Sequence, residues 1–281
     1  MSATLSPSER PPVEIAALQA NRAVAALRLA AAVREGQTRL ADLAEGGGYR
    51  IKFPHPARGL EAVLVNTGGG LLGGDRLALE VEAGEGADLM MTSQSAEKVY
   101  RAVEAAATIG LSLRVGAGGR LHWLPMETIL FSGARLARRI EAEVAPEGEL
   151  MIAEATVFGR IAMGETLGPG LLSDIWRIRR GGRLVYADSL RLGGALGPLL
   201  ARPAVTNGAS AMASLVLVSP RAESLVDEAR ALLSHEGVEA GVSAWNGLLV
   251  ARLLAADPAR LRPLFTSLTA ALGGRATPRF W

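Results

Sequence analysis

The sequence predicts a mainly β protein, in which a long strand-rich body precedes a small α+β part at the C-terminal end. Between about residues 27 and 192, short segments alternate apolar and polar residues with a period of two, as in Leu77, Leu79 and Val81. Turns separate these segments, and many of the chain's 33 glycines lie in them. Period-two alternation broken by frequent turn residues is typical of half-buried strands.

The C-terminal part carries the two helical patterns of the chain. A first helix is expected to start at Ser219, followed by a proline in its first turn, and to end at Gly237. A second is expected to start at Asp257 and end at Gly273, and residues 241–254 between them form a strand or hairpin. We therefore divide the chain into a flexible leader (residues 1–20), a β body (21–200) and a C-terminal α+β part packed on the body (201–281).

Composition excludes several classes of protein. Cysteine is absent, which rules out disulfides, zinc ribbons, iron–sulfur clusters and thiol nucleophiles. The three histidines, His55, His122 and His235, are too scattered for an ordinary zinc or copper site. With 30 basic and 28 acidic residues, the net charge of +2 is a poor footprint for a nucleic-acid partner. We find no export signal and no membrane-spanning stretch, and expect a cytoplasmic protein with no membrane partner.

Two local patterns have more than one interpretation. Gly68, Gly70 and Gly73 match the dinucleotide-binding fingerprint, but a strand pattern follows where that fingerprint needs a helix. We therefore expect a tight turn there. His122 lies between Leu121 and Trp123 on a predicted strand and faces away from both, so we expect it to be a surface or turn residue. No nucleophile-elbow motif is present, and a Ser–His–Asp triad is disfavoured.

Three carboxylates follow the parity of apolar neighbours on predicted strands: Asp75, Glu154 and Asp188. An unpaired buried carboxylate costs several kcal/mol, on the order of its desolvation penalty, so each needs a partner or water. One interpretation is salt bridging to nearby arginines. The other is a hydrated internal passage whose oxygen ligands suit a divalent cation in transit. The arginines considered for the first interpretation are Arg76, Arg160 and Arg191.

Several motifs, in order, resemble those of the UreD (also UreH) family of urease accessory proteins, from about residue 21 to the end of the chain. They comprise residues 69–77, 92–101, 124–131, 154–165, 188–192 and 278–281. Met126 departs from the family pattern, which more often has glutamine there. The motif residues that we single out are Gly73, Gly74, Lys98, Tyr100, Arg160 and Glu165.

The resemblance implies a β-helix-like body of stacked sheets and a non-enzymatic chaperone of nickel insertion, with no catalytic residues. It implies binding to apo-urease subunits and to UreF, and through UreF to UreG. It further implies that Ni²⁺ passes transiently through an internal tunnel, with no stably bound metal or other cofactor, and Asp75, Glu154 and Asp188 match the family's acidic tunnel positions. Two alternatives stay open: a pure adaptor without a metal path, and a carboxylate-dependent hydrolase that uses Glu154 and Asp188.

Overall fold

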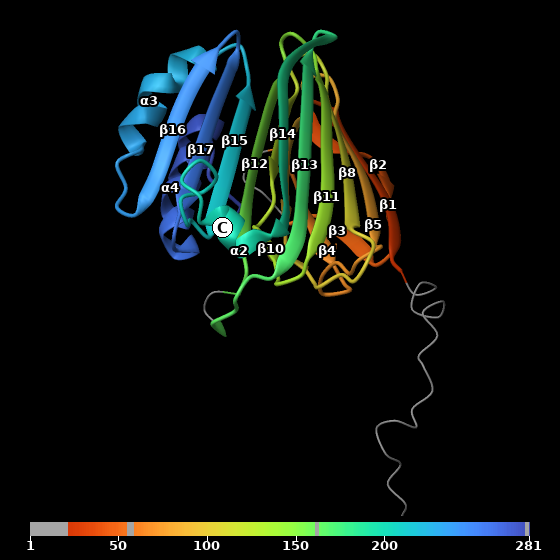
Figure 1. The fold of residues 1–281 in the computed structure, drawn as a ribbon. Coiled ribbons are helices and arrows are strands. Elements are labelled where there is room, and N and C mark those ends of the chain that lie inside the picture. Colours follow the sequence, from red (N-terminus) through yellow and green to blue (C-terminus); the bar gives the residue numbers. More distant parts are fainter. Residues whose placement is uncertain (1–21, 55–58, 161–162, 279–280) are drawn as a thin grey trace, which may run out of the picture.

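The computed structural model describes residues 22–54, 59–160, 163–278 and 281, so the predicted leader and His55 lie outside the described residues. Two β-sheets face each other, and helices cover the outer side of one of them (Figure 1). We call the seven-stranded sheet A and the ten-stranded sheet B. In spatial order, sheet A contains β14 (Arg183–Ala195), β13 (Pro169–Arg180), β11 (Arg135–Val144), β8 (Ala107–Val115), β5 (Arg76–Ala83), β1 (Val24–Arg34) and β2 (Gln37–Ala44).

Sheet B runs through the C-terminal part as well as the body. In spatial order it contains β16 (Val238–Trp245), β17 (Leu248–Ala255), β15 (Ala211–Val218), β12 (Glu149–Phe158), β9 (Arg120–Leu124), β6 (Asp88–Ser93), β4 (Leu60–Asn66) and β3 (Tyr49–Lys52). The short strand β10 (Thr128–Leu130) pairs with β12 and with β7 (Glu97–Val99). Because β15 pairs with β12, the C-terminal strands continue the sheet of the body.

The chain crosses repeatedly from one sheet to the other, which confirms the predicted β-helix-like body. Strands β5, β8, β11 and β13 are parallel neighbours in sheet A, and β6, β9 and β12, which alternate with them in sequence, are parallel neighbours in sheet B. Successive coils are unequal in length, since the sheet A strands begin at Arg76, Ala107, Arg135 and Pro169. This inequality explains why no fixed-period repeat is visible in the sequence.

Two apolar cores result from the alternation of side chains. The larger lies between the sheets and contains the inward residues of both, such as Leu79 and Ile140 from sheet A and Ile152 from sheet B. The second lies between sheet B and the helices α3 (Val226–Leu232) and α4 (Pro258–Gly273), where Leu268 of α4 is fully buried. Strand β12 contributes to both cores, because its two faces alternate between them.

The helices match the sequence prediction in part. Helix α4 confirms it, with the Asp257 side chain accepting from Ala259 N at 2.9 Å and Gly274 ending the helix at φ 58°. Residues 241–254 fall in the β16–β17 hairpin, as expected. The first helix begins later than predicted, because a 3₁₀ turn, η3 (Glu223–Leu225), precedes α3, and it ends earlier, at Leu232.

Two further findings concern the helices. The hydroxyl of Ser219, the expected N-cap of the first helix, accepts from Arg221 N at 3.3 Å and also donates to Glu149 Oε2 at 2.9 Å, which ties the start of this segment to sheet B. A short helix that the sequence did not indicate, α2 (Leu196–Leu200), follows β14. Across the part of the chain that the structure describes, no helix is long and apolar enough to cross a membrane.

Candidate functional site: a polar belt between the sheets

Charged side chains interrupt the apolar core between the sheets. The alternation that buries Leu136 and Ile140 of β11 also places Arg138 between the sheets, and Asp174 of β13 and Glu154 of β12 point inward by the same rule. Arg138 and Glu154 are each 5% exposed and Asp174 is 9% exposed. We call Arg138, Glu154 and Asp174, together with Asp188 and Arg252, the polar belt.

Arg138 is the centre of the belt because it binds two carboxylates at once. Its Nε donates to Asp174 Oδ1 at 3.0 Å and its Nη2 donates to Asp174 Oδ2, while Nη1 donates to Glu154 Oε2. Such bidentate, charge-assisted bonds fix the guanidinium firmly. One positive charge thus faces two carboxyl groups in a site nearly closed to solvent.

Two tryptophans complete the shell of hydrogen bonds around these carboxyl groups. Trp123 Nε1 donates to Glu154 Oε1 at 2.7 Å, and Trp176 Nε1 donates to Asp174 Oδ1 at 2.9 Å. Burial raises the pKa of Glu154, although Arg138 and Trp123 act in the opposite direction. Burial alone would lower the pKa of Arg138, but the adjacent carboxylates Asp174 and Glu154 raise it, so the guanidinium stays charged.

Asp188 lies at the edge of the belt, where β14 ends sheet A. Its side chain is 29% exposed, and Arg252 of β17 donates to its Oδ2 at 2.7 Å. Tyr186 donates to the same oxygen at 3.3 Å. Asp188 of β14 pairs in register with Trp176 of β13, two residues from Asp174, so Asp188 and Asp174 are diagonal neighbours on adjacent strands. The belt therefore extends from the centre of the core to its more accessible side.

Asp75 occupies a different kind of place, in the turn before β5. It is 4% exposed, and its carboxylate accepts two backbone N–H groups, from Ala23 at 2.9 Å and from Leu72 at 2.7 Å. The strand register puts Arg76 level with Ala137. Asp75 therefore lies nearer than Arg138 to the end of the body where β5 begins, and β8 separates β5 from the strand of Arg138. Its backbone donors give this carboxylate a role in holding the turn.

The arginine partners differ from those considered from the sequence. Arg138 and Arg252 pair with the predicted acids, whereas Arg160 pairs with Glu165. The pair of Arg138 and Glu154 could not be predicted from the sequence, because the two residues lie on β11 and β12, which belong to different sheets. Neither Arg76 nor Arg191 has an ion pair with a carboxylate among the residues that the structure describes.

Sequence reasoning missed Glu97, although it lies within a motif that we quoted. Glu97 Oε2 accepts from the Tyr49 hydroxyl at 3.2 Å and its Oε1 accepts from Asn66 Nδ2 at 2.9 Å. Burial raises the pKa values of Glu97 and Tyr49, and the negative charge of Asp75 adds to both shifts. Glu97 and Val99 lie on the same side of β7, but this strand has only three residues, too few for the alternation to predict burial from the sequence.

A narrow cavity connects Glu97 with the belt. Its volume is about 50 Å³, and Glu97, Glu154 and Arg138 line it together with apolar residues of both sheets. That volume is enough for a few water molecules, which need about 10–15 Å³ each. Glu97 and Glu154 therefore share one cavity between the sheets, whereas Asp75 and Asp188 do not line it.

The acidic side chains of this arrangement are dispersed rather than grouped. Among the described residues, no three histidine, aspartate or glutamate side chains are grouped as a metal ion would require. Carboxylate oxygens spread over several strands can attract a divalent ion by charge without chelating it. The same dispersion is unfavourable for a hydrolase, because Asp188 does not line the cavity that Glu154 faces.

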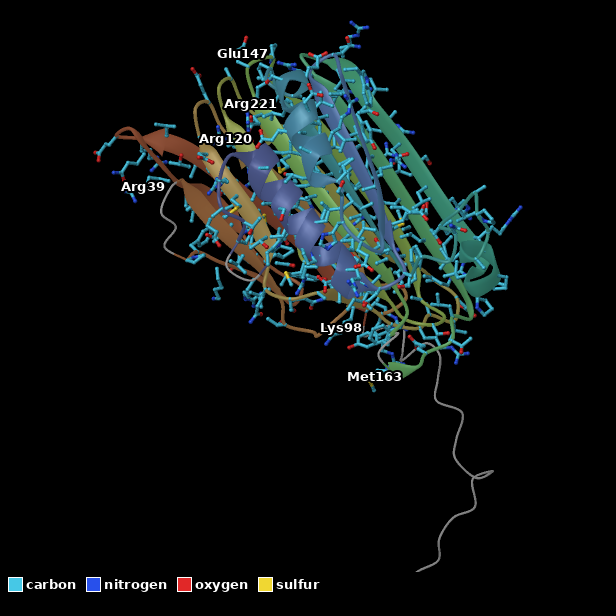
Figure 2. All side chains as sticks on the ribbon, turned by 90° about the vertical axis from the view of Figure 1, so that its left-hand side faces the viewer. Arg39, Lys98, Arg120, Glu147, Met163 and Arg221 are labelled. Carbon is cyan, nitrogen blue, oxygen red and sulfur yellow. The ribbon has the colours of Figure 1, made fainter. Side chains whose placement is uncertain are left out.

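The motif residues singled out from the sequence gather at the end of the body where β5 and β11 begin. Gly74 has φ 91°, and a Cβ on Gly73 would lie 2.6 Å from Ala102 Cβ, so the glycine run forms the expected tight turn. Arg160 Nη2 donates to Glu165 Oε1 at 2.8 Å, and Tyr100 donates to Gly69 O at 3.1 Å. The side chain of Lys98 is exposed at the same end (Figure 2).

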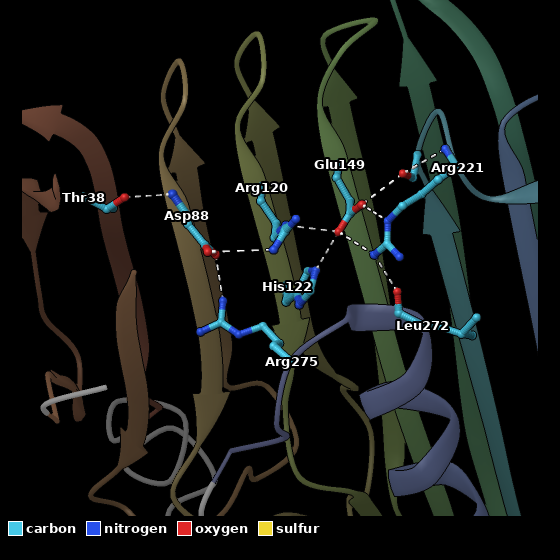
Figure 3. A network of polar contacts seen from close by, with 9 residues as sticks. Thr38, Asp88, Arg120, His122, Glu149, Arg221, Leu272 and Arg275 are labelled. Atoms are coloured by element: carbon cyan, nitrogen blue, oxygen red, sulfur yellow. Dashed lines mark hydrogen bonds and ion pairs between the residues drawn. The ribbon is translucent and has the colours of Figure 1, made fainter. Parts of the chain in front are cut away.

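A second polar cluster lies on the opposite face of sheet B, and it corrects the prediction for His122 (Figure 3). His122 does face away from Leu121, but helix α4 covers that face of β9, so its exposure is 0%. Gly273 of α4 packs against the ring, since a Cβ there would lie 3.2 Å from the imidazole Cε1. Burial lowers the pKa of His122, which keeps the ring neutral.

Glu149 is the centre of this second cluster, which we call the Glu149 cluster. It accepts from Arg221 Nε at 2.9 Å, from Ser219 and, at 3.2 Å, from His122 Nε2, and Arg120 lies 3.2 Å away. Burial opposes ionisation, but the hydrogen bonds from His122 and Arg221 and the charge of Arg221 lower the pKa of Glu149 to about 2. Arg221 Nη2 also donates to Leu272 O at 2.7 Å, so the cluster fastens the end of α4 to sheet B.

Comparisons with known proteins agree on one family. The family model described as "UreD urease accessory protein" matches residues 23–281. A urease accessory protein UreD of Methylobacterium sp. (strain 4-46) is 51% identical, over 89% of this chain and 90% of its own length. Urease accessory protein UreD 2 of Methylorubrum populi is 50% identical over 99% and 95%, and the UreD of Xanthobacter autotrophicus is 49% identical over 91% and 88%.

Proposed function

The chain belongs to the UreD family of urease accessory proteins, and from that premise we propose that it is a non-enzymatic, cytoplasmic scaffold for the maturation of urease. It binds apo-urease subunits and UreF, and reaches UreG through UreF. Ni²⁺ is its cargo, which passes between the two sheets on the way to the urease active site.

The observation that supports a metal path is the row of acidic groups in the core between the sheets. Glu97 and Glu154 face one narrow cavity, the charge of Asp75 acts on Glu97, and Asp188 lies one register step from Asp174 on the neighbouring strand. Transit of an ion requires sites favourable enough to enter and weak enough to leave. Dispersed carboxylates, partly compensated by Arg138, meet both conditions.

Glu97 is the residue on which the proposal can be tested most cleanly. Within the described part of the chain its hydrogen bonds come from neutral groups, Tyr49 and Asn66, so replacing its charge leaves no arginine without a partner. Glu97→Gln keeps the size of the side chain and an acceptor for Asn66. A matched control is Glu141→Gln, since Glu141 is 55% exposed on the outer face of β11.

The test is to co-express each variant with the urease subunits, UreF and UreG, and to measure complex recovery and nickel per urease active site. We expect Glu97→Gln to form complexes as the parent does and to deliver less nickel, and Glu141→Gln to match the parent in both. Full nickel loading by Glu97→Gln would contradict the metal path. Failure of the parent chain to recover any of these proteins would contradict the scaffold itself.

The pure adaptor is the second candidate, and one observation favours it. Arg138 fills the space between Glu154 and Asp174, so these carboxylates already have a counter-ion. In an adaptor this network only stabilises the core, and nickel travels elsewhere. The adaptor is distinguished by normal nickel loading in every acidic variant that still forms complexes.

A further inference from the structure

An open depression with three arginines lies at the end of the body where β5 and β11 begin. Its volume is about 860 Å³, more than that of the inter-sheet cavity, and it is separate from the polar belt. This end is at the bottom of Figure 2, where Lys98 and Met163 are labelled, and Glu147 is labelled at the opposite end. The charged and aromatic residues that line the depression are Tyr100, Arg101, Phe131, Arg135, Arg160 and Glu165.

The charges in the depression are not balanced from within. Glu165 is bound by Arg160 at 2.8 Å. Across residues 22–54, 59–160, 163–278 and 281, neither Arg101 nor Arg135 has a carboxylate within ion-pair distance. Nε of Arg135 is shielded from solvent and has no hydrogen-bond acceptor, which is unfavourable for a cationic donor. Two uncompensated guanidinium groups therefore face one open space.

Aromatic and aliphatic groups frame these charges. The Arg160 guanidinium lies 4.5 Å from the centre of the Phe131 ring, and Tyr100 meets the same ring edge-on with centroids 5.1 Å apart. At the rim, Leu72 is 44% exposed and Val103 is 91% exposed. Arginine and aromatic residues beside exposed aliphatic groups are the composition found at the energetic centres of protein interfaces.

From these features we propose that the depression binds an acidic segment of a partner protein. Carboxylates of the segment pair with Arg101 and Arg135, whose planar guanidinium groups suit bidentate recognition. An apolar side chain of the segment covers Val103. A small inorganic anion would leave most of the volume and the aliphatic rim unused. The inference rests on the proposed function in one respect, namely that the partner is one of the proteins with which this chain assembles.

The position of the depression gives it a further consequence. Leu72 lines its rim, and the backbone N–H of Leu72 donates to Asp75 Oδ2 at 2.7 Å. The turn that holds Asp75 is therefore the wall between the docked segment and the acidic groups inside the body. A partner bound here sits directly beside one end of the row of carboxylates.

Charge reversal of Arg101 tests the proposal in the full chain, co-expressed with the urease subunits and UreF. We expect Arg101→Glu to lower recovery of the protein that carries the acidic segment by about tenfold or more, because a close charge pair at an interface changes the affinity by at least that factor. Arg101→Lys, which keeps the charge, should lose far less. Arg139→Glu is the matched control, since Arg139 is 56% exposed on the outer face of β11.

Cross-linking identifies the segment itself. A photo-reactive phenylalanine analogue at Val103 should cross-link to a partner peptide rich in aspartate or glutamate, and reversing an acidic residue of that peptide to lysine should restore binding to Arg101→Glu. Equal recovery by Arg101→Glu and Arg139→Glu, or cross-links only to neutral or basic peptides, would overturn the proposal. The proposed function fails separately, if the parent chain recovers neither urease nor UreF.

Discussion

Two glutamates on the same strand, Glu149 and Glu154 of β12, have opposite surroundings. Glu149 points toward α4 and is bound by Arg120, His122, Ser219 and Arg221, and its pKa is lowered to about 2. Glu154 points between the sheets, shares one arginine with Asp174, and has its pKa raised by burial. At the first site one carboxylate has two arginine partners, whereas at the second site two carboxyl groups share one arginine. Excess compensation suits a structural contact, whereas a shortage of positive charge is what the proposed metal path requires.

The largest expected effect is on stability, from Glu149→Gln. The amide would leave Arg221 without its anion beneath α4 and Arg120 with only Asp88, 3.9 Å away, and would loosen the end of that helix. Breaking a buried ion pair from one side costs about 3–5 kcal/mol. We expect urea denaturation of the purified chain to show a loss in that range. Glu141→Gln serves as the control, and equal stability of the two variants would show that the cluster is not a clamp.

Glu154→Gln should be less harmful to folding, because Arg138 keeps both of its bonds to Asp174. The loss is about 1–3 kcal/mol, the cost of one poorly satisfied buried hydrogen bond. Its effect should appear in function, as less nickel per urease active site at undiminished complex recovery. Loss of the complexes along with the nickel would instead place Glu154 with Glu149 among structural residues.

The two glutamates should also respond to pH with opposite sign. The folded-state pKa of Glu149 lies below its unfolded value, so its contribution to stability is present above about pH 4.5 and is lost as the pH falls towards 2. That contribution is on the order of 3 kcal/mol. We expect Glu149→Gln to flatten the acid limb of a stability profile measured by denaturation. An unchanged acid limb would mean that other carboxyl groups dominate acid unfolding.

The folded-state pKa of Glu154 is raised, so the folded chain holds this proton when the unfolded chain has lost it. Stability then decreases as the pH rises from about 4.5 through the folded-state pKa. Glu154→Gln should remove this decrease, so that the difference between variant and parent narrows at higher pH. A variant that falls further behind the parent as pH rises would show that Arg138 stabilises the ionised carboxylate fully.

The sequence predicts the side on which a residue lies better than it predicts what that residue meets. Parity placed Glu154 inside correctly, because alternation is a local property of a strand, whereas Asp75 precedes β5 and is buried in a turn by its backbone donors. The partner of Glu154 could not be read from the sequence, since Arg138 belongs to a strand of the facing sheet. His122 was assigned to the correct face and to the wrong environment. The helix that covers it begins at Pro258, so only tertiary packing brings the two together.

The smallest effect is expected from Asp188→Asn, and it tests how far the row of acidic groups extends. Asp188 and Arg252 are 29% and 56% exposed, and a solvent-exposed ion pair contributes about 0–1 kcal/mol, so folding should hardly change. If Asp188 marks the outer end of a metal path, nickel per urease active site should fall slightly at low nickel supply. It should recover when nickel is abundant, because supply then offsets weaker attraction at the entrance. Glu154→Gln, whose site lies further along the path, should not recover in this way. Identical nickel dependence of Asp188→Asn and the parent would confine the acidic row to Asp75, Glu97 and Glu154.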